Sequence, residues 1–429
     1  MLPYVRINFA NGAIGGSAAM DDGCTGLICN AEAVTGDTNF KLGTNYLITS
    51  LKELEALGIT AESTGANANV YKCVKEFYDE APKGTKLYIR GAAVGTSADP
   101  VGIDYLVDKD LAHAWPLLEY AKGEIRTLIV KGTDPADYTI HTDNGETGND
   151  KVEYGMDVVV IDAINNAQLL AVSATETLKA PLLVLLEARH YTGTPGDLPN
   201  LTGEAKNRVA VVLGDTKRDS VTESGLTTVV SSEGAAVGLV AGRLARIPVQ
   251  RSIARVKDGS IPATRLYIGT VVAESGNPET IHDKGFICPR TFVGKGGYYW
   301  SDDCLAAPAS DDYCLIPRRR TIDKAYRIAY LAMLEQVSDE IALTAEGKIA
   351  PSVCKNMETV MESAIINQMT SVGNLGNDPQ DPNDTGVKAY IDPDQNIVAT
   401  SMLNASLRVR PYGYAKYIEV DLGFQTLNQ

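Results

Sequence analysis

The sequence contains no apolar run that is long enough to span a membrane. No stretch approaches the roughly 18 to 20 apolar residues that cross a bilayer, and residues 1–16 lack the basic leader and apolar core of a signal segment. The seven cysteines include no Cys-x-x-Cys pair, which favours a reduced cytosolic environment during assembly. Basic residues are few, 39 against 54 acidic ones, for a net charge of -15. We therefore expect no membrane insertion and no nucleic-acid partner.

Motifs for nucleotide and hydrolase chemistry are also missing. The glycine amides of residues 294–297 would suit an anion, but the phosphate-loop spacing with its Ser or Thr is absent. We interpret this run as a tight turn between strands. No Gly-x-Ser-x-Gly elbow is present. Four aspartates could supply the paired carboxylates of a general acid and base: Asp302, Asp303, Asp311 and Asp312. Positions in surface turns and helix caps explain these four residues more simply.

Metal sites have little support. Residues 381–386 place oxygen ligands at calcium-loop positions 1, 3 and 5, with Asp392 at position 12, but Pro382 favours a solvated loop. Cys24 and Cys29 lack a second pair at zinc spacing. No i, i+4 pair occurs among the four histidines, His113, His141, His190 and His282. We expect no cofactor, no metal and no enzymatic activity, and keep a soluble α/β enzyme with an unrecognised site as an alternative.

What the sequence does contain is the pattern of an α/β protein. Its 429 residues, 44% of them apolar, suffice for two or three domains. Helices and buried strands alternate, which predicts a largely buried sheet. The expected helices are 50–57, 69–80 and 110–121, and the expected strands are 87–89, 125–130, 158–161, 182–186 and 209–213. A helix at 233–246 contains three glycines, which predicts a close backbone approach to a neighbour.

The C-terminal third has a different pattern. Long amphipathic helices are expected at 321–341 and 351–369, followed by strands at 387–391, 396–410 and 417–424. Both chain ends alternate apolar with polar residues, at 4–9 and at 418–424. Such strands bury one face and need a partner for their backbone groups. The partner is either the chain's own sheet or that of another molecule.

Arg318, Arg319 and Arg320, with Lys324, form the one sharp basic cluster in this acidic chain. Cations at a helix N-terminus oppose the helix dipole. Acidic groups from another element or another subunit would relieve that repulsion. Nucleic-acid binding is the weaker alternative.

The stretch from Gly285 to Ala325 resembles the C-terminal half of contractile phage tail sheath proteins. In that family a glycine-flanked aromatic strand leads through a loop to an arginine pair that opens a long helix. The matching residues here are 285–292, 294–303, 312–313 and 318–325, and residues 26–28, 48–58, 232–246 and 408–424 follow the same order. The sequence looks closest to divergent sheath-like proteins of phages and injection particles from Bacteroidetes.

The resemblance implies a two-domain α/β (α+β mixed) fold, with mixed sheets flanked by helices and extended N- and C-terminal strand arms. It implies an N-terminal arm at 1–20, an outer α/β domain at 21–280 and a C-terminal core domain at 281–429. It also implies a structural subunit of hexameric rings, stacked helically around a tail tube, which contract to drive the tube through the target envelope. Its partners would be copies of itself, the inner tube protein, the baseplate and the tail terminator. Its location would be the virion tail, assembled in the host bacterial cytoplasm.

The same resemblance assigns roles to particular residues. The exchanged arms would pack Val5, Ile7 and Phe9 at one end and Ile418, Val420, Leu422 and Phe424 at the other. The cluster Arg318, Arg319, Arg320 and Lys324 would supply charge between subunits, and Lys355, Glu358 and Glu362 would face the tube. A tail terminator or a baseplate part remains an alternative role.

Overall fold

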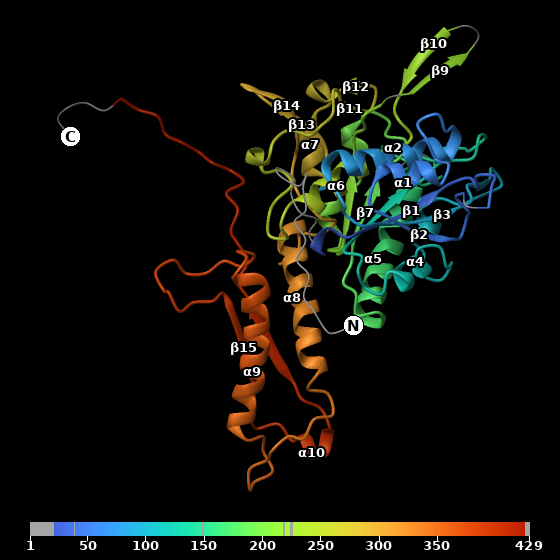
Figure 1. The fold of residues 1–429 in the computed structure, drawn as a ribbon. Helices are drawn as coiled ribbons and strands as arrows, with labels where there is room; N and C mark the ends of the chain where they lie inside the picture. Colours follow the sequence, from blue (N-terminus) through green and yellow to red (C-terminus); the bar gives the residue numbers. More distant parts are fainter. Residues whose placement is uncertain (1–20, 38, 148–149, 218, 224–225, 425–429) are drawn as a thin grey trace, which may run out of the picture. The chain divides into compact units, whose positions relative to one another are not determined.

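A computed structural model of the chain describes residues 21–37, 39–147, 150–217, 219–223 and 226–424 (Figure 1). Two compact units divide the chain between Tyr330 and Leu331. The expected N-terminal arm, with Val5, Ile7 and Phe9, lies outside the described residues. No helix in the described ranges is long and apolar enough to cross a membrane.

The first unit is built on a six-stranded mixed sheet with the order β2-β3-β1-β6-β7-β8. β2 runs antiparallel to β3, and the other neighbours are parallel. The strands are β1 (Thr25–Asn30), β2 (Asn45–Ile48), β3 (Leu87–Ala92), β6 (Thr127–Lys131), β7 (Leu183–Glu187) and β8 (Val209–Val212). All residues of β1, β6, β7 and β8 are buried, as a sheet covered on both faces requires.

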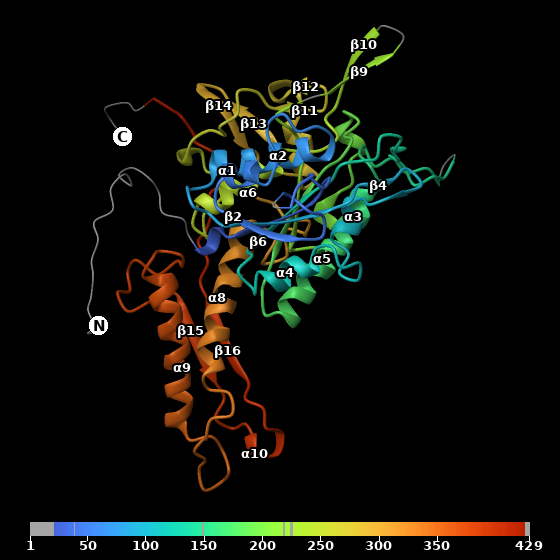
Figure 2. The ribbon, with the colours of Figure 1, turned by 45° about the vertical axis from the view of Figure 1, so that its right-hand side comes forward.

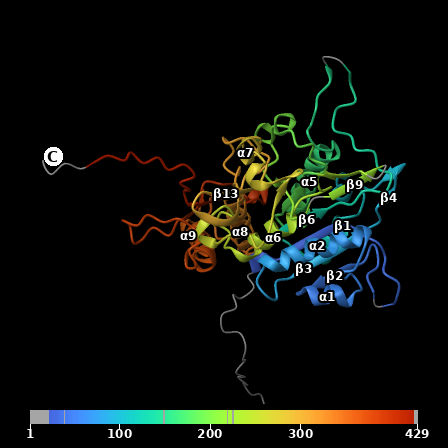
Figure 3. The same ribbon diagram turned by 90° about the horizontal axis from the view of Figure 1, so that it is seen from above.

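Helices cover both faces of this sheet (Figures 2 and 3). One face is covered by α2 (Gly65–Glu80) and α6 (Val237–Arg246), with α1 (Leu51–Ala56) beside α2. The other face is covered by α3 (Ile103–Leu106), α4 (Trp115–Tyr120) and α5 (Val159–Thr177). The largely buried α/β sheet expected from the alternation of helices and strands is confirmed, and helices on both faces give it three layers.

The glycines of α6 allow it to touch α2. A Cβ atom on Gly238 would lie 2.3 Å from the carbonyl oxygen of Cys73, and one on Gly242 would lie 2.4 Å from that of Phe77. No real Cβ atom can approach so closely, so these two positions require glycine. The predicted close backbone approach is confirmed.

Smaller elements complete the first unit, and α8 (Ile316–Leu334) begins in it. Residues 294–297 form the turn and first residues of a hairpin, as expected. The elements are β4 (Gly95–Thr96), β5 (Asp99–Pro100), β9 (Asp219–Glu223), β10 (Leu226–Val230), β11 (Tyr267–Ile268), β12 (Val271–Val272), α7 (Pro278–Asp283), β13 (Pro289–Phe292) and β14 (Lys295–Trp300), together with short 3-10 turns of which η1 (Asp21–Gly23) is the first.

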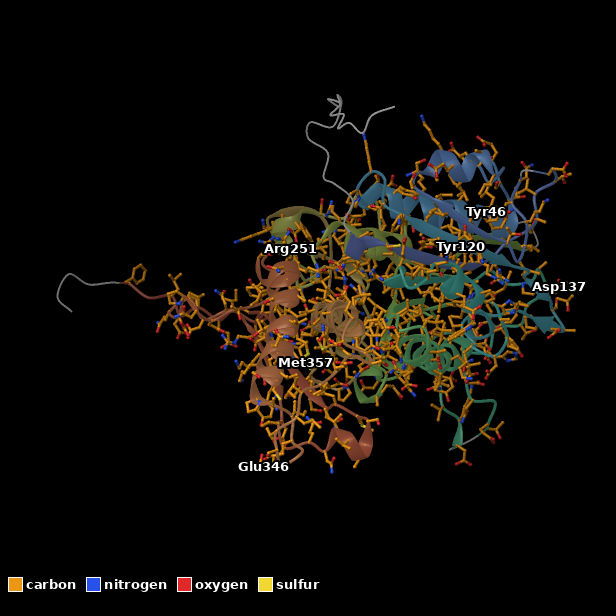
Figure 4. All side chains as sticks on the ribbon, turned by 60° about the horizontal axis from the view of Figure 1, so that its bottom comes forward. Tyr46, Tyr120, Asp137, Arg251, Glu346 and Met357 are labelled. Carbon is orange, nitrogen blue, oxygen red and sulfur yellow. The ribbon has the colours of Figure 1, made fainter. Side chains whose placement is uncertain are left out.

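The second unit packs one long helix on a two-stranded antiparallel sheet. α9 (Pro351–Ile365), continued by a π-helical turn at Ile366–Thr370, covers β15 (Val387–Ile391) and β16 (Ala405–Val409), and α10 (Ile397–Thr400) lies between the strands in sequence. Met357, labelled on α9 in Figure 4, is one of the core residues. The others are Ile349, Cys354, Met361, Ala389 and Ile391.

Three secondary-structure predictions need correction. Residues 158–161, expected as a strand, instead open α5, where the amide of Val159 donates to the carboxylate of Asp157. A four-residue apolar run does not by itself distinguish a strand from a buried helix. The helix expected from residue 110 begins only at Trp115, because Pro116 favours the first turn. Residues 396–410, expected as one strand, form the short helix α10 at Ile397–Thr400 and a strand only at Ala405–Val409. The exchanged strand expected at 417–424 stays a prediction, and these residues pair with no strand in the described part of their own chain.

The compact units divide the chain later than the predicted boundary near residue 280. Ile287 pairs in parallel with Val212 at the edge of the first sheet, and Trp300 is buried in the same core. Residues 281–330 therefore pack with the first unit. The functional division into 1–20, 21–280 and 281–429 stays a prediction about assembly.

Candidate assembly interface

A buried ionic network lies where the parallel strands of the first sheet end. Lys131 at the end of β6 lies 2.5 Å from the carboxylate of Glu187 at the end of β7. Arg189 contacts Glu187 and Asp134, both at 2.7 Å. Burial alone would raise the pKa of Glu187, but Lys131 and Arg189 together hold it below its usual value. The carboxyl edge of an α/β sheet is a common ligand site, yet here the charges neutralise one another.

The neighbouring cavity, of about 430 Å³, is lined by Lys72, Lys75, Glu76 and Asp79 of α2 among others. Lys72 contacts both Glu76, at 2.8 Å, and Asp215. Burial raises the pKa of Glu76 despite this contact. Lys75 pairs with Asp79 within α2 at 2.6 Å, whereas Lys72 also reaches the carboxylate of Asp215, outside the helix. The arrangement ties α2 to the end of the sheet and presents no nucleophile with a base beside it.

The loop residues considered as possible metal ligands form local hydrogen bonds instead. Asp381 accepts from the amide of Asn383 at 2.9 Å, and Asp384 from that of Gly386 at 3.1 Å, as in ordinary surface loops. Within the described ranges no three side chains are placed to hold a metal ion. The interpretation of Asp302 and Asp303 as surface turns is wrong, because both side chains are buried.

The other candidates are scattered across the structure. Cys24 and Cys29 are separate buried thiols. His190 contacts Asp134 at 2.5 Å and stacks on Tyr138, and His282 lies 3.1 Å from Asp302. These contacts join side chains of one chain and leave no shared centre.

The basic cluster opens α8 and binds groups of its own chain. Arg319 contacts Asp323 at 2.5 Å, and Arg208 reaches the same carboxylate at 3.2 Å. Arg320 is buried and donates to the carbonyl oxygen of Leu244 at 2.9 Å. Burial lowers its pKa to about 10. Arg318 is half-buried. The acidic partners expected from another element are therefore supplied within the chain, while a role between subunits stays a prediction.

Asp22 contacts two residues of this cluster, Lys324 and Arg320, and also Arg327. Its carboxylate lies 2.6 Å from Lys324 and 2.9 Å from Arg327, and its carbonyl oxygen accepts from Arg320 at 3.4 Å. Burial would raise the pKa of Asp22, but the ion pair and hydrogen bond with Lys324, and then Arg327, hold it below its usual value. Gly23 lies so close to α6 that a Cβ there would be 2.7 Å from the carbonyl oxygen of Ala245. The start of the described chain is thus fixed to α8 and α6.

Two glutamates of α9 bind the backbone amides along one edge of the two-stranded sheet formed by β15 and β16. Glu358 accepts from the amide of Ile391, and Glu362 from that of Ala389, both at 2.8 Å. Lys355 lies 2.5 Å from Glu358, and this contact, more than any other, lowers the pKa of that glutamate. Among the three residues predicted to face a tube, Glu358 is buried and Glu362 is half-buried, so only Lys355 is highly exposed.

The chain beyond β16 is extended and exposed. Its apolar side chains stand almost fully in solvent, at 77% for Ile418 and Val420, 97% for Leu422 and 104% for Phe424. Large apolar side chains rarely stay exposed in a row unless another surface covers them. The alternating pattern expected of an exchanged strand is therefore present, without a partner in the described part of this chain.

Reasoning from sequence missed Asp22, the edge-closing role of Glu358 and Glu362, and the network of Lys131 and Glu187. No local pattern marks Asp22, because its partners lie about three hundred positions away. A weak signal existed for the network, since Lys131 and Glu187 each end a buried apolar strand.

Comparisons with known proteins agree with this architecture. The family described as DUF2586, N-terminal domain, matches residues 2–304, and DUF2586, C-terminal domain, matches residues 312–428. No curated protein matches the sequence. The contracted helical sheath of the anti-feeding prophage has a similar structure, with a TM-score of 0.60, 13% identity and 99% of each chain covered. A chain of the baseplate of that prophage gives 0.59 at 13% identity, again over 99% of each chain.

The contracted PVC sheath complex of an extracellular contractile injection system is also similar. Its TM-score is 0.56 at 12% identity, with 100% of this chain and 99% of that chain covered. At such identities the likeness shows the fold. The expected two-domain mixed α/β fold of sheath proteins is therefore confirmed.

Proposed function

The chain belongs to the DUF2586 family and has the fold of contractile sheath proteins, and from that premise we propose that it is a structural subunit of a contractile tail sheath. The observation that carries the proposal is the extent of the fold match, 99% of this chain and 99% of the anti-feeding prophage sheath chain. Nearly the whole of each chain takes part in the likeness. The subunit acts through its interfaces and not through a reaction.

In the proposed assembly, six subunits form a ring, rings stack helically around an inner tube, and the stack ends at a baseplate and a tail terminator. Contraction is a rigid-body rearrangement of subunits between two packings. The free energy released in that change drives the tube, and no nucleotide is hydrolysed. The particle is a phage tail or a related injection device, assembled in the host bacterial cytoplasm.

The terminal arms hold the subunits together in this proposal. Strand addition forms main-chain hydrogen bonds that do not depend on the side chains around them, so it can survive a change of packing. The exposed row Ile418, Val420, Leu422 and Phe424 supports a C-terminal arm of this kind. The N-terminal arm would contribute Val5, Ile7 and Phe9, with residues 281–429 as the core domain and 21–280 as the outer domain.

Two of the charged residues that were predicted to lie at interfaces remain candidates for that role. Arg318 is half-buried and forms no ion pair with the described residues, whereas Arg319 and Lys324 pair with aspartates of their own chain and Arg320 is buried. Among the four clustered cations, Arg318 is therefore the best candidate for a contact between subunits. Lys355, whose side chain is 73% exposed, is the best candidate of its group for the tube-facing surface. Arg319, Arg320 and Lys324 hold parts of the first unit together.

Electron microscopy of the purified protein tests the proposal directly. Hollow ridged cylinders are expected in negative stain, with a helical repeat built of six-fold rings. A variant lacking residues 1–11 should stay folded and form no cylinders. Uniform small particles from the full-length protein, under conditions that span salt and protein concentration, would overturn the proposal.

A second candidate role is a sheath-like baseplate part or a tail terminator. It is favoured by the structural likeness to a chain of the anti-feeding prophage baseplate. Such a protein would form single rings. Images showing isolated rings that never stack would decide for this role.

A further inference from the structure

One lysine and two carboxyl groups form a buried triad between α2 and the loop after β8. Nζ of Lys72 in α2 lies 2.8 Å from Glu76, four positions further along the helix, and contacts Oδ1 of Asp215. The side chain of Asp215 is 3% exposed and that of Glu76 is 7% exposed. The amine of Lys72 is thus in contact with one carboxyl group while a second carboxyl group lies beside it.

The two carboxyl groups of the triad differ in how readily they hold a proton. Burial would raise the pKa of Asp215, but Lys72 and then Lys131 hold it below its usual value. Burial raises the pKa of Glu76, and the charge of Asp215 adds to this effect, although Lys72 opposes it. Oε2 of Glu76 is buried and forms no hydrogen bond with the described residues. Glu76 is therefore the carboxyl group that keeps a proton, beside an ion pair of Lys72 and Asp215.

Hydrogen-bond donors surround the carboxyl group of Asp215. The amide of Thr216 donates to Oδ1 at 2.7 Å, and the hydroxyl of Ser232 donates to Oδ2. The hydroxyl of Thr216 donates to Glu76 at 2.7 Å. Donors in such positions stabilise the negative charge that develops on a carboxyl oxygen when its carbon is attacked. The site thus combines an amine, a proton-carrying group and donors around one carboxyl carbon.

We propose that Lys72 and Asp215 become joined by an amide bond between Nζ and Cγ. While both groups are charged, the amine has no free electron pair and is not a nucleophile. Transfer of a proton from Nζ to the carboxylate gives a neutral amine and a carboxylic acid. Nζ then attacks Cγ, and Glu76 gives its proton to the departing hydroxyl group and takes one from the nitrogen. Amine and acid become amide and water, so the reaction needs no co-reactant.

Position and burial favour this reaction. The fold holds the reacting groups of Lys72 and Asp215 in contact, which replaces a bimolecular encounter by an intramolecular one. The amide product removes two buried charges, whose desolvation opposes folding. The cavity of about 430 Å³ that Lys72 and Glu76 help to line gives the released water a path out of the site.

The other buried lysine of this region has a different environment. Lys131 contacts Glu187, but Arg189 binds the same carboxylate at 2.7 Å, and the amides of Gly132 and Ala235 donate to it. A guanidinium group does not give up its proton. Glu187 therefore stays a carboxylate, which an amine does not attack. Lys131 provides an internal control for the reaction of Lys72.

The amide bond would fix the middle of α2 to the loop after β8. It would join residues 143 positions apart in the sequence. Such a cross-link restricts the unfolded chain in the way a disulfide does. The wild type should therefore migrate faster on a denaturing gel than Lys72→Arg, which keeps the positive charge but cannot form the bond.

Mass spectrometry of the full-length protein, unfolded before measurement, tests the bond. The wild type should be lighter than its sequence by one water molecule, and a tryptic digest should contain residues 53–75 joined to residues 209–217. Lys72→Arg and Glu76→Gln should each have the full mass of their sequence. Lys131→Arg should still lose one water molecule, because it leaves the triad unchanged.

The mass of the wild type decides the inference even where a variant fails to fold. A folded wild type of full mass would overturn it, and so would a loss of water that persists in Lys72→Arg. None of these outcomes depends on the formation of cylinders. The inference and the proposed function can therefore fail separately.

Discussion

The carboxylate of Asp22 lies 2.6 Å from Nζ of Lys324, and this pair joins residues 302 positions apart. It connects the start of the described chain to the first half of α8. Arg327, three positions further along the helix, holds the other carboxylate oxygen at 2.9 Å. One buried carboxylate thus bridges two cations on the same face of α8.

Removing the charge of Asp22 should destabilise the first unit. Asp22→Asn leaves Lys324 and Arg327 without their carboxylate, and breaking a partly buried pair should lower the free energy of unfolding by about 1–3 kcal/mol. Urea unfolding measures the change. Asp110→Asn is the matched control, because Asp110 is 76% exposed in its pair with Lys109 and should change stability little. Equal effects of the two variants would contradict the bridge.

The contribution of Asp22 should vanish in acid. Its pKa is lowered from the usual 3.8 in the folded chain. The unfolded chain therefore binds the proton first, and the stabilisation is present above pH 3.8 and lost as the pH falls through the folded pKa. The difference in unfolding free energy between wild type and Asp22→Asn should shrink steadily below that pH. A difference that stays constant down to pH 2 would refute this linkage.

Alanine at Gly238 or Gly242 should destabilise the chain although alanine favours helices. Helix propensity alone would stabilise by about 1 kcal/mol. The new Cβ would collide with a carbonyl oxygen of α2, and overpacking of this kind costs about 1–3 kcal/mol. Thermal unfolding should show a lower melting temperature for both variants. Gly196→Ala serves as the control, because a Cβ there meets no atom within 4 Å. Stabilised variants at Gly238 and Gly242 would disprove the helix contact.

Glu358 should matter more than Glu362 for the second unit. Glu358→Ala leaves the buried amide of Ile391 without an acceptor, which should cost about 1–3 kcal/mol. Glu362→Ala should cost less, since its side chain is 24% exposed and water can replace it. Amide hydrogen exchange at Ile391 should speed up in the first variant. Glu358→Gln retains an oxygen acceptor and should exchange at an intermediate rate. Identical exchange in all three would show that the glutamate does not hold this edge.

Proline at Ala405 should separate folding from assembly. Ile391 lies opposite Ala405 and donates its amide to Glu358, so this pair carries no ladder hydrogen bond and the amide of Ala405 points away from β15. Proline at Ala405 therefore removes no bond of the ladder. The variant should keep its melting temperature and lose cylinders. Ser406→Pro is the contrasting variant, because its amide belongs to the ladder with β15 and its loss should lower the melting temperature as well. Cylinders formed by Ala405→Pro at the wild-type concentration would exclude pairing at this edge.

Local patterns predicted much of the fold. The pattern of residues 387–391 predicted the strand β15, and the glycines of α6 predicted a close approach to a neighbour, which is α2. Residues 158–161 misled because a short apolar run suits a strand and a buried helix equally. The contacts of the candidate interface were harder to predict from the sequence than the fold. The partners of Arg320 and Lys324 come from distant segments, and sequence spacing does not encode such pairing.

The glutamates of α9 illustrate the same difficulty in a second form. Glu358 and Glu362 lie four positions apart and look like an ordinary solvated face. Only the register of β15 reveals that their carboxylates meet backbone amides. The spacing of the two glutamates can be read from the sequence. Which edge of β15 their carboxylates contact depends on tertiary packing.

The attachment of Asp22 to α8 by two ion pairs affects how this part of the chain would respond to force. α8 runs without a break from Ile316 to Leu334, past the boundary between the two units. A displacement of Asp22 would strain its ion pairs with Lys324 and Arg327 together, because one carboxylate holds both cations. Ion pairs loaded in parallel share the force, so this junction resists displacement of Asp22 more strongly than either ion pair would alone.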